Sequence, residues 1–208
     1  MARLKGIANQ QCGDDHNALS SFQALAAFVW RSITRARDLP KDEQTTCSVV
    51  MGTRSRLNPP VSEDVFGNFV RKAQWACDVD ELLGNDLGRA ALNIRKCIMA
   101  IDGEAILDFY KKLSNSPMVV RRGLIEPEPY WGSNSVIIGG STRFNTYGPE
   151  FGFGRALTVR TGYGNKKDGK IVANPGCEGG GSVDLEICLR PHIMAALESN
   201  QEFMNFVS

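Results

Sequence analysis

The stretch SSFQALAAFVWRSITRAR, residues 20–37, has the spacing of a helix with one buried face. Its apolar side chains recur every three or four positions: Phe22, Leu25, Ala26, Val29, Trp30 and Ile33. A serine stands just before them, where its hydroxyl can cap free N–H groups. Leu39-Pro40 ends the pattern. The stretch therefore predicts a capped helix packed against a core.

Short β-prone stretches surround this helix. They predict strands at residues 45–51, 135–138, 157–161, 170–173 and 183–189. A turn at 165–169 would join the third and fourth of these strands as a hairpin. The sequence GCEGGG, residues 176–181, predicts a tight loop before the last strand.

Two further helical patterns complete the chain. Residues 85–113 carry a long pattern that Gly103 interrupts, and Pro191 opens a helix near the C-terminus. Helices and strands alternate early, and strands cluster late. The chain is therefore expected to form an α/β fold in mixed layers.

The composition excludes several classes of protein. The formal net charge of the 208 residues is +1, which argues against a nucleic-acid surface or a basic membrane patch. No apolar run approaches the roughly 20 residues of a membrane span, and the first ten residues lack the apolar region of a signal peptide. We therefore expect neither a nucleic-acid partner nor a membrane partner.

Cysteines and histidines give little sign of a reactive centre. The six cysteines contain no CxxC pair, so they predict reduced thiols in a cytoplasmic compartment. With only His16 and His192 to help, no metal site is expected. Either histidine could in principle act as a general base, but both positions favour surface residues. Cys177 is the most exposed candidate nucleophile, and we expect it to be non-catalytic.

An arginine pair and a glycine-rich motif raise the question of an ion pair. Arg54 and Arg56 follow the first predicted strand, and Glu150 lies among glycines and aromatics in YGPEFGFGR, residues 147–155. These neighbours suggest that Glu150 is partly buried, and a buried carboxylate needs a partner. A guanidinium offers a two-pronged donor, although a solvated loop end is the simpler reading of both arginines. The GCEGGG loop is a poor phosphate site, because a strand rather than a helix follows it.

Four segments, in order, resemble the plant BAHD acyltransferases. They are residues 20–37, TRSRLNPPVSEDVFGN at 53–68, EFGFG at 150–154 and GCEGGGSVDLEICL at 176–189, which includes Cys177 and ends at Leu189. The EFGFG motif is similar to the DFGWG motif of that family, with Glu150 in place of Asp and Phe153 in place of Trp. The resemblance spans nearly the whole chain.

The resemblance implies a chloramphenicol-acetyltransferase-like fold, a mixed sheet with flanking helices. Such enzymes have two similar domains, and a channel between them admits acyl-CoA from one side and an alcohol or amine from the other. This chain matches the C-terminal domain only. We expect residues 1–208 to form one C-terminal BAHD-like domain, with 1–19 as a helix/loop remnant. Residues 155–173 would be the segment that crosses to the N-terminal domain.

The catalytic HxxxD motif of the family is absent from this sequence. Four residues after His16 stands Ser20, and four after His192 stands Ala196. We therefore expect no catalytic residue here and no activity by this chain alone. Its partner would be an N-terminal half or an intact homologue. The alternatives are a non-catalytic interaction or CoA-binding module, or a truncated gene product.

The resemblance also implies the site residues. The structural motif would be Glu150, Phe151, Gly152, Phe153 and Gly154, with Glu150 paired to Arg54 or Arg56. Acyl-CoA would be a cosubstrate, with no covalently bound cofactor. Residues expected near the CoA and acceptor channel are Ser20, Ser21, Gly67, Asn68, Ser141, Thr142 and Arg143.

Overall fold

The computed structural model describes residues 1–13, 18–117, 134–140 and 142–207. The helices are α1 (Ala2–Cys12), α2 (Ser21–Arg37), α3 (Val79–Gly84), α4 (Leu87–Met99), α5 (Gly103–Asn115), α6 (Pro191–Glu198) and α7 (Gln201–Met204). The strands are β1 (Gln44–Gly52), β2 (Val70–Asp78), β3 (Ser135–Gly140), β4 (Lys170–Pro175) and β5 (Val183–Cys188). Two short 3-10 turns are η1 (Arg54–Arg56) and η2 (Tyr163–Asn165).

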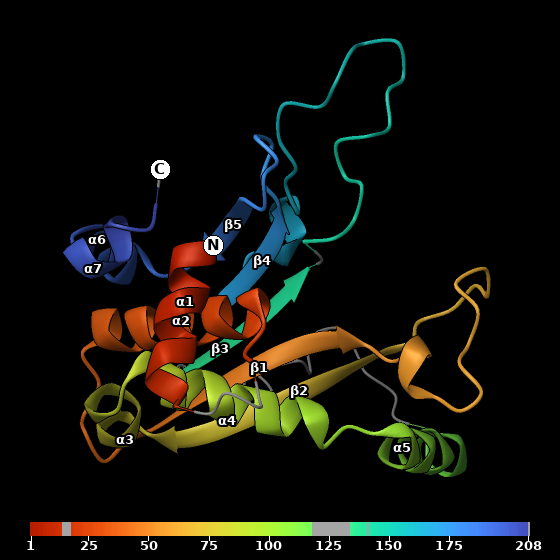
Figure 1. Ribbon diagram of the computed structural model, residues 1–208, viewed down its shortest axis with the longest axis horizontal. Helices are drawn as coiled ribbons and strands as arrows, with labels where there is room; N and C mark the ends of the chain where they lie inside the picture. The colour runs from red at the N-terminus through yellow and green to blue at the C-terminus, as the bar shows by residue number, and fades with distance from the viewer. Residues whose placement is uncertain (14–17, 118–133, 141, 208) are drawn as a thin grey trace.

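The strands form one mixed sheet in the order β2-β1-β3-β4-β5. The inner strands β1, β3 and β4 run parallel, and the outer strands β2 and β5 run antiparallel to their neighbours. Because parallel neighbours end at the same edge, the carboxyl ends of β1, β3 and β4 meet there (Figure 1). The predicted mixed sheet with flanking helices is confirmed.

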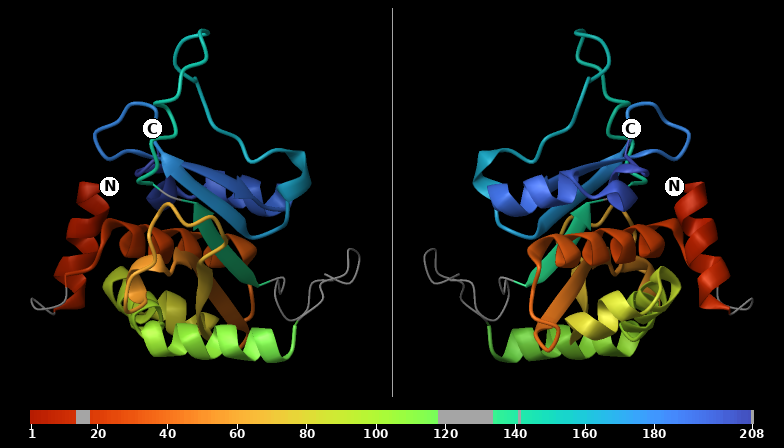
Figure 2. Two further views of the ribbon diagram at one scale, coloured as in Figure 1. Left: turned by 90° about the vertical axis from the view of Figure 1, so that its right-hand side faces the viewer. Right: turned by 90° about the vertical axis from the view of Figure 1, so that its left-hand side faces the viewer.

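Helix α2 lies at the centre of the helical layer. It contacts β1 on one side and α1, α4 and α6 around its other sides, so most of its residues are buried. The sheet presents alternate side chains to it, including Cys47 and Val49 of β1, Val136 and Ile138 of β3, and Ile171 of β4. Figure 2 shows these layers from the side. A helix buried all round suits the apolar run predicted for residues 20–37.

Polar contacts at the N-terminus and in the middle of α2 fix its position. Ser20 is the N-cap, as predicted: its Oγ accepts from the N–H of Gln23, and the Gln23 side chain accepts from the N–H of Ser20. In the middle, the indole of Trp30 donates to Oγ1 of Thr45 across 3.0 Å. These bonds satisfy polar groups that would otherwise be buried without partners.

The structure corrects three expectations. Residues 157–161 form no strand, because they make no ladder hydrogen bonds with any of the described strands. The predicted hairpin is therefore wrong: β4 pairs with β3 and β5 instead. The strand β2 was not predicted, because its polar residues interrupt the alternation of apolar and polar side chains that is typical of a strand. The break at Gly103 is confirmed, because it separates α4 from α5.

A buried ion pair joins three parts of the fold. At the end of α2, Arg37 donates to Asp168 across 3.1 Å and to the carbonyl of Ser135 at the start of β3. The side chains of Arg37 and Asp168 are 2% and 26% exposed. Asp168 also accepts from the N–H of Arg190, the N-cap of α6. The Arg37–Asp168 pair thus holds the ends of α2, β3 and α6 together.

Asp168→Asn should lower the free energy of unfolding by about 2–4 kcal/mol, because Arg37 would stay buried without its counter-charge. Urea unfolding followed by circular dichroism measures the loss. Asp80→Asn is the matched control. It removes the Lys41–Asp80 pair, whose side chains are 86% and 67% exposed, and should cost less than about 0.5 kcal/mol. Equal losses in the two variants would contradict the role of the buried pair.

Candidate functional site

Several predicted channel residues lie at the carboxyl edge of the parallel strands. Residues 38–43 reverse the chain between α2 and β1, so the N-terminus of α2 points toward the end at which β1 finishes (Figure 1). Ser20 is exposed there and Ser21 is half-buried. Thr142 and Arg143 follow β3 at the same edge, and Ser141 lies outside the described residues. Open α/β sheets commonly bind ligands at this edge.

The loop between β1 and β2 carries the two arginines. Arg54 donates to the carbonyls of Val65 and Gly67, at 2.6 and 3.1 Å, and its guanidinium lies over the ring of Phe69. Gly67 and Asn68 are exposed at the end of this loop. The Arg54 guanidinium thus joins the start of the loop to its end.

Arg56 ties the same loop to the helical layer. It donates to the carbonyls of Ile98 and Ile101, each at 2.9 Å, at the junction of α4 and α5. Glu150 is exposed, so the expected partial burial is wrong. In the described part of the chain no ion pair includes Glu150. The structure gives both arginines backbone partners and does not bring them to Glu150.

The EFGFG motif lies on a segment that projects from the body of the molecule. Residues 148–158 are all exposed, and Phe151 and Phe153 are 84% and 97% exposed. Gly152 and Gly154 adopt positive φ angles of 87° and 84°, a backbone region that glycine enters without strain. The segment rises beyond the ends of β3 and β4 (Figure 1). The phenylalanines therefore do not pack in this chain, in contrast to the expected supporting role.

Two carboxylates of β5 bind the ends of this segment. Tyr147, which is 7% exposed, donates its hydroxyl to Asp184 across 3.0 Å. Thr161 donates both its N–H and its hydroxyl to Glu186, each at 2.9 Å. Lys166 forms an ion pair with the same carboxylate. Hydrogen bonds from Lys166 and from the Thr161 N–H lower the pKa of Glu186 to about 2.

Among the described residues, the candidate nucleophile Cys177 and the candidate base His192 show no activating partner. Burial, reinforced by the Glu178 carboxylate, raises the pKa of the Cys177 thiol, which disfavours a reactive thiolate. Burial also raises the pKa of Cys77 to about 11. His192 is exposed in the first turn of α6, as expected, and His16 lies outside the described residues. Six free cysteines occur in the chain.

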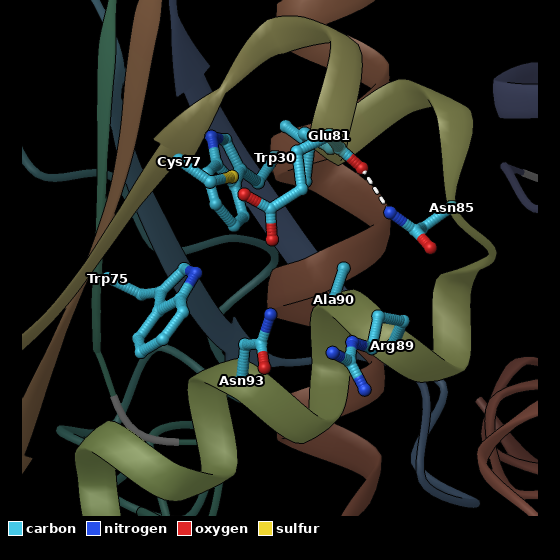
Figure 3. A pocket seen from close by; sticks show the side chains of 9 residues that line it. Trp30, Trp75, Cys77, Glu81, Asn85, Arg89, Ala90 and Asn93 are labelled. Atoms are coloured by element: carbon cyan, nitrogen blue, oxygen red, sulfur yellow. Dashed lines mark hydrogen bonds between the residues drawn. The ribbon is translucent and has the colours of Figure 1, made fainter.

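Two hollows differ greatly in size. A void of about 10 Å³ lies between β2, α2, α3 and α4, where the buried indole N–H of Trp75 has no hydrogen-bond partner (Figure 3). It has room for no more than a single water molecule. An open hollow of about 820 Å³ surrounds β5 and is lined on one side by α2, α6 and α7 and on the other by residues 157–160. Of the predicted channel residues that the structure describes, none lines either hollow.

Neither a cluster of metal-ligating side chains nor a membrane-spanning helix occurs in the described ranges. No group of three or more His, Cys, Asp or Glu side chains is placed to share an ion there. Among the same residues, no helix combines the length and apolar character needed to cross a bilayer.

Comparison with known proteins gives the family. A family model described as the transferase family matches residues 1–204. BAHD acyltransferase DCR of Arabidopsis thaliana is 32% identical over 202 residues, covering 97% of this chain and 40% of that protein. An uncharacterized acetyltransferase of the same plant is 32% identical over 205 residues, covering 97% of this chain and 44% of that protein. The chain belongs to the transferase family of BAHD acyltransferases.

Solved structures confirm the predicted fold. F. sporotrichioides TRI101, solved with coenzyme A and T-2, superposes with a TM-score of 0.84 over 98% of this chain and 47% of its own, at 19% identity. Vinorine synthase superposes with a TM-score of 0.69 over all of this chain and 46% of its own, at 17% identity. The chain therefore spans less than half the length of these proteins and of the two relatives above.

The residues that sequence reasoning missed are Asp184 and Glu186. Their alternation with Val183, Leu185 and Ile187 predicted only that one face of β5 is polar. Their partners Tyr147 and Thr161 lie far along the chain, so no local pattern could pair them. The only signal in the sequence was that Asp184 and Glu186 occupy two successive outward-facing positions of the predicted strand.

The pH dependence of stability tests the Glu186 contacts. Its pKa is about 2 against an ordinary 4.5, so the folded state is stabilised above pH 4.5 and loses this stabilisation as the pH falls from 4.5 toward 2. Glu186→Gln should therefore lower the free energy of unfolding at about pH 7. Its difference from the parent chain should shrink below pH 4.5 and vanish near pH 2. Urea titrations of both proteins across this pH range measure the difference in the free energy of unfolding. A difference that does not change with pH would count against these contacts.

Proposed function

We propose that this chain forms the C-terminal half of an acyl-CoA-dependent acyltransferase that acylates an alcohol or amine of a small molecule. Acyl-CoA is its cosubstrate, and an N-terminal half or an intact homologue is its partner. The six free cysteines favour a reducing, cytoplasmic compartment. Side chains from both halves determine which acceptor is bound. We therefore propose the acceptor only as a small-molecule alcohol or amine.

The observation that carries this proposal is the extent of the family match. It covers residues 1–204 of this chain, yet less than half of each relative compared above. A fold built to face a second domain should leave apolar side chains exposed. Phe144, Phe151, Phe153, Leu157 and Tyr163 are 72–97% exposed on one segment. Of these, Leu157 and Tyr163 lie within residues 155–173 and support that range as part of the surface that meets the N-terminal half.

The channel residues belong to this proposal. Ser20, Ser21, Thr142 and Arg143 lie at the carboxyl edge of the parallel strands, and Gly67 and Asn68 lie on the loop that follows β1. This edge is the side on which the CoA and acceptor channel would open. The ion pair of Glu150 with Arg54 or Arg56 stays a prediction for the two-domain enzyme.

The chain alone lacks the catalytic base. Neither His16 nor His192 has an aspartate four residues later. General-base help is typically worth about 10²–10⁴-fold in rate, and this chain supplies none by the family mechanism. We therefore place catalysis in the partner half and binding surfaces in this one.

A second candidate is a non-catalytic interaction or CoA-binding module. The exposed apolar side chains of residues 144–163 favour it, because they suit a binding partner whether or not acyl transfer follows. The two candidates differ in whether a complete channel turns over acyl-CoA.

The chain alone should not transfer acetyl groups from acetyl-CoA to alcohols or amines above the uncatalysed rate, because it lacks the base. Release of free CoA, detected with a thiol reagent, measures this. Turnover that His16→Ala abolishes would contradict the proposal. Calorimetric titration with CoA then separates a CoA-binding chain from one that needs its partner to bind.

A chimera tests the acyltransferase proposal directly. These 208 residues would replace the matching 205 residues of the Arabidopsis acetyltransferase relative. We expect CoA release that depends on an acceptor, because the relative supplies the missing half. The control chimera has the histidine of its HxxxD motif replaced by alanine and should lose at least about 100-fold in rate. A folded chimera with no turnover on any alcohol or amine acceptor would favour the interaction module instead.

A further inference from the structure

We propose that Asp184 and Glu186 are positioning residues that hold the two ends of the exposed segment 148–160, which carries the EFGFG motif. We call this pair the β5 clamp. The contacts that hold the segment all lie within this chain. Its use in acyl transfer rests on the proposed function.

The geometry of β5 places both carboxylates on one face of the sheet. Asp184 and Glu186 are two residues apart, so their side chains point the same way. They lie opposite Asn174 and Val172 of β4. Leu185 and Ile187 point to the other face and pack against the hydrophobic core. The core thus fixes the strand, and the strand fixes the carboxylates.

Each carboxylate binds one end of the segment. The hydroxyl of Tyr147 donates to Asp184 immediately before residue 148, and Thr161 donates two hydrogen bonds to Glu186 immediately after residue 160. The Glu186 side chain is 10% exposed, so water competes weakly for it. Hydrogen bonds to a charged acceptor are about twice as strong as neutral ones.

A third contact holds the middle of the segment. Arg155 donates to the carbonyl of Cys177 across 3.0 Å, and its guanidinium lies 5.4 Å from the ring centre of Tyr147. Cys177 belongs to the glycine loop between β4 and β5. Each of the hydrogen bonds from Tyr147, Arg155 and Thr161 therefore ends on β5 or on the loop that leads into it.

Burial cannot explain how the segment is held. Residues 148–158 are exposed, including Phe151, Phe153 and Leu157. Ordering each backbone residue costs roughly 1–2 kcal/mol of conformational entropy. With little apolar area removed from water, the polar contacts of the clamp are what oppose that cost. The clamp would present the motif to a second domain in one orientation.

Trypsin cleavage of the full chain tests the clamp without any activity. The bonds after Arg160 and Lys166 adjoin groups that Glu186 binds, whereas the bond after Lys41 lies in an exposed turn outside the segment and serves as an internal reference. Glu186→Gln should raise the initial cleavage rates after Arg160 and Lys166 by roughly five- to tenfold relative to cleavage after Lys41.

Two further variants control for folding and charge. Thr161→Val removes one donor and keeps the carboxylate, and should raise the ratio for Arg160 by about two- to threefold. Glu202→Gln breaks the exposed Arg35–Glu202 pair on α7 with the same change of charge, and should leave both ratios unchanged. Unchanged ratios in Glu186→Gln, with an unchanged melting temperature, would overturn the clamp.

The chimera tests the positioning role. There Glu186→Gln should raise the KM for acyl-CoA about fivefold and leave kcat within about twofold, because positioning affects binding before chemistry. Unchanged KM and kcat would overturn the positioning role. An inactive chimera would contradict the proposed function instead, and the cleavage ratios in the chain alone would still decide the clamp.

Discussion

The burial of α2 is the constraint on which the rest of the structure depends. This helix lies between β1 and the outer helices, and its buried residues leave no free face. Its position is set by polar contacts as well as by packing: the Ser20 cap, the Trp30–Thr45 bond and the Arg37–Asp168 ion pair. Since β1 must return beneath it, the carboxyl edge of the sheet and the N-terminus of α2 face the same way.

A second consequence concerns what the fold leaves uncovered. The core is built from α2, the inner strands and the flanking helices, and it leaves residues 148–158 outside. Asp184 and Glu186 hold the ends of this segment, while Phe151 and Phe153 remain in solvent. A fixed segment with exposed aromatics suits a surface that meets another domain. The length of the family relatives agrees with that reading.

Local patterns predicted the elements whose residues carry their own signal. Helix α2 was predicted from its cap and spacing, β1 and β5 from their β-prone residues, and the break before α5 from Gly103. Residues 157–161 alternate like a strand, yet a strand needs ladder hydrogen bonds and they make none with the described strands. The long-range polar pairs could not be predicted, because Arg37 and Asp168, or Tyr147 and Asp184, lie far apart in the sequence. The Glu150 ion pair followed from the resemblance and is not formed by the described residues.

Hydrogen–deuterium exchange tests the central claim that this chain is one half of a two-domain acyltransferase. The chain alone is compared with the chimera that supplies the N-terminal half. We predict that amides of residues 148–160 exchange at least about tenfold more slowly in the chimera, because the second domain covers them. Amides of β1, residues 44–52, should exchange at the same rate in both. Equal exchange of residues 148–160 in the two proteins would contradict the account.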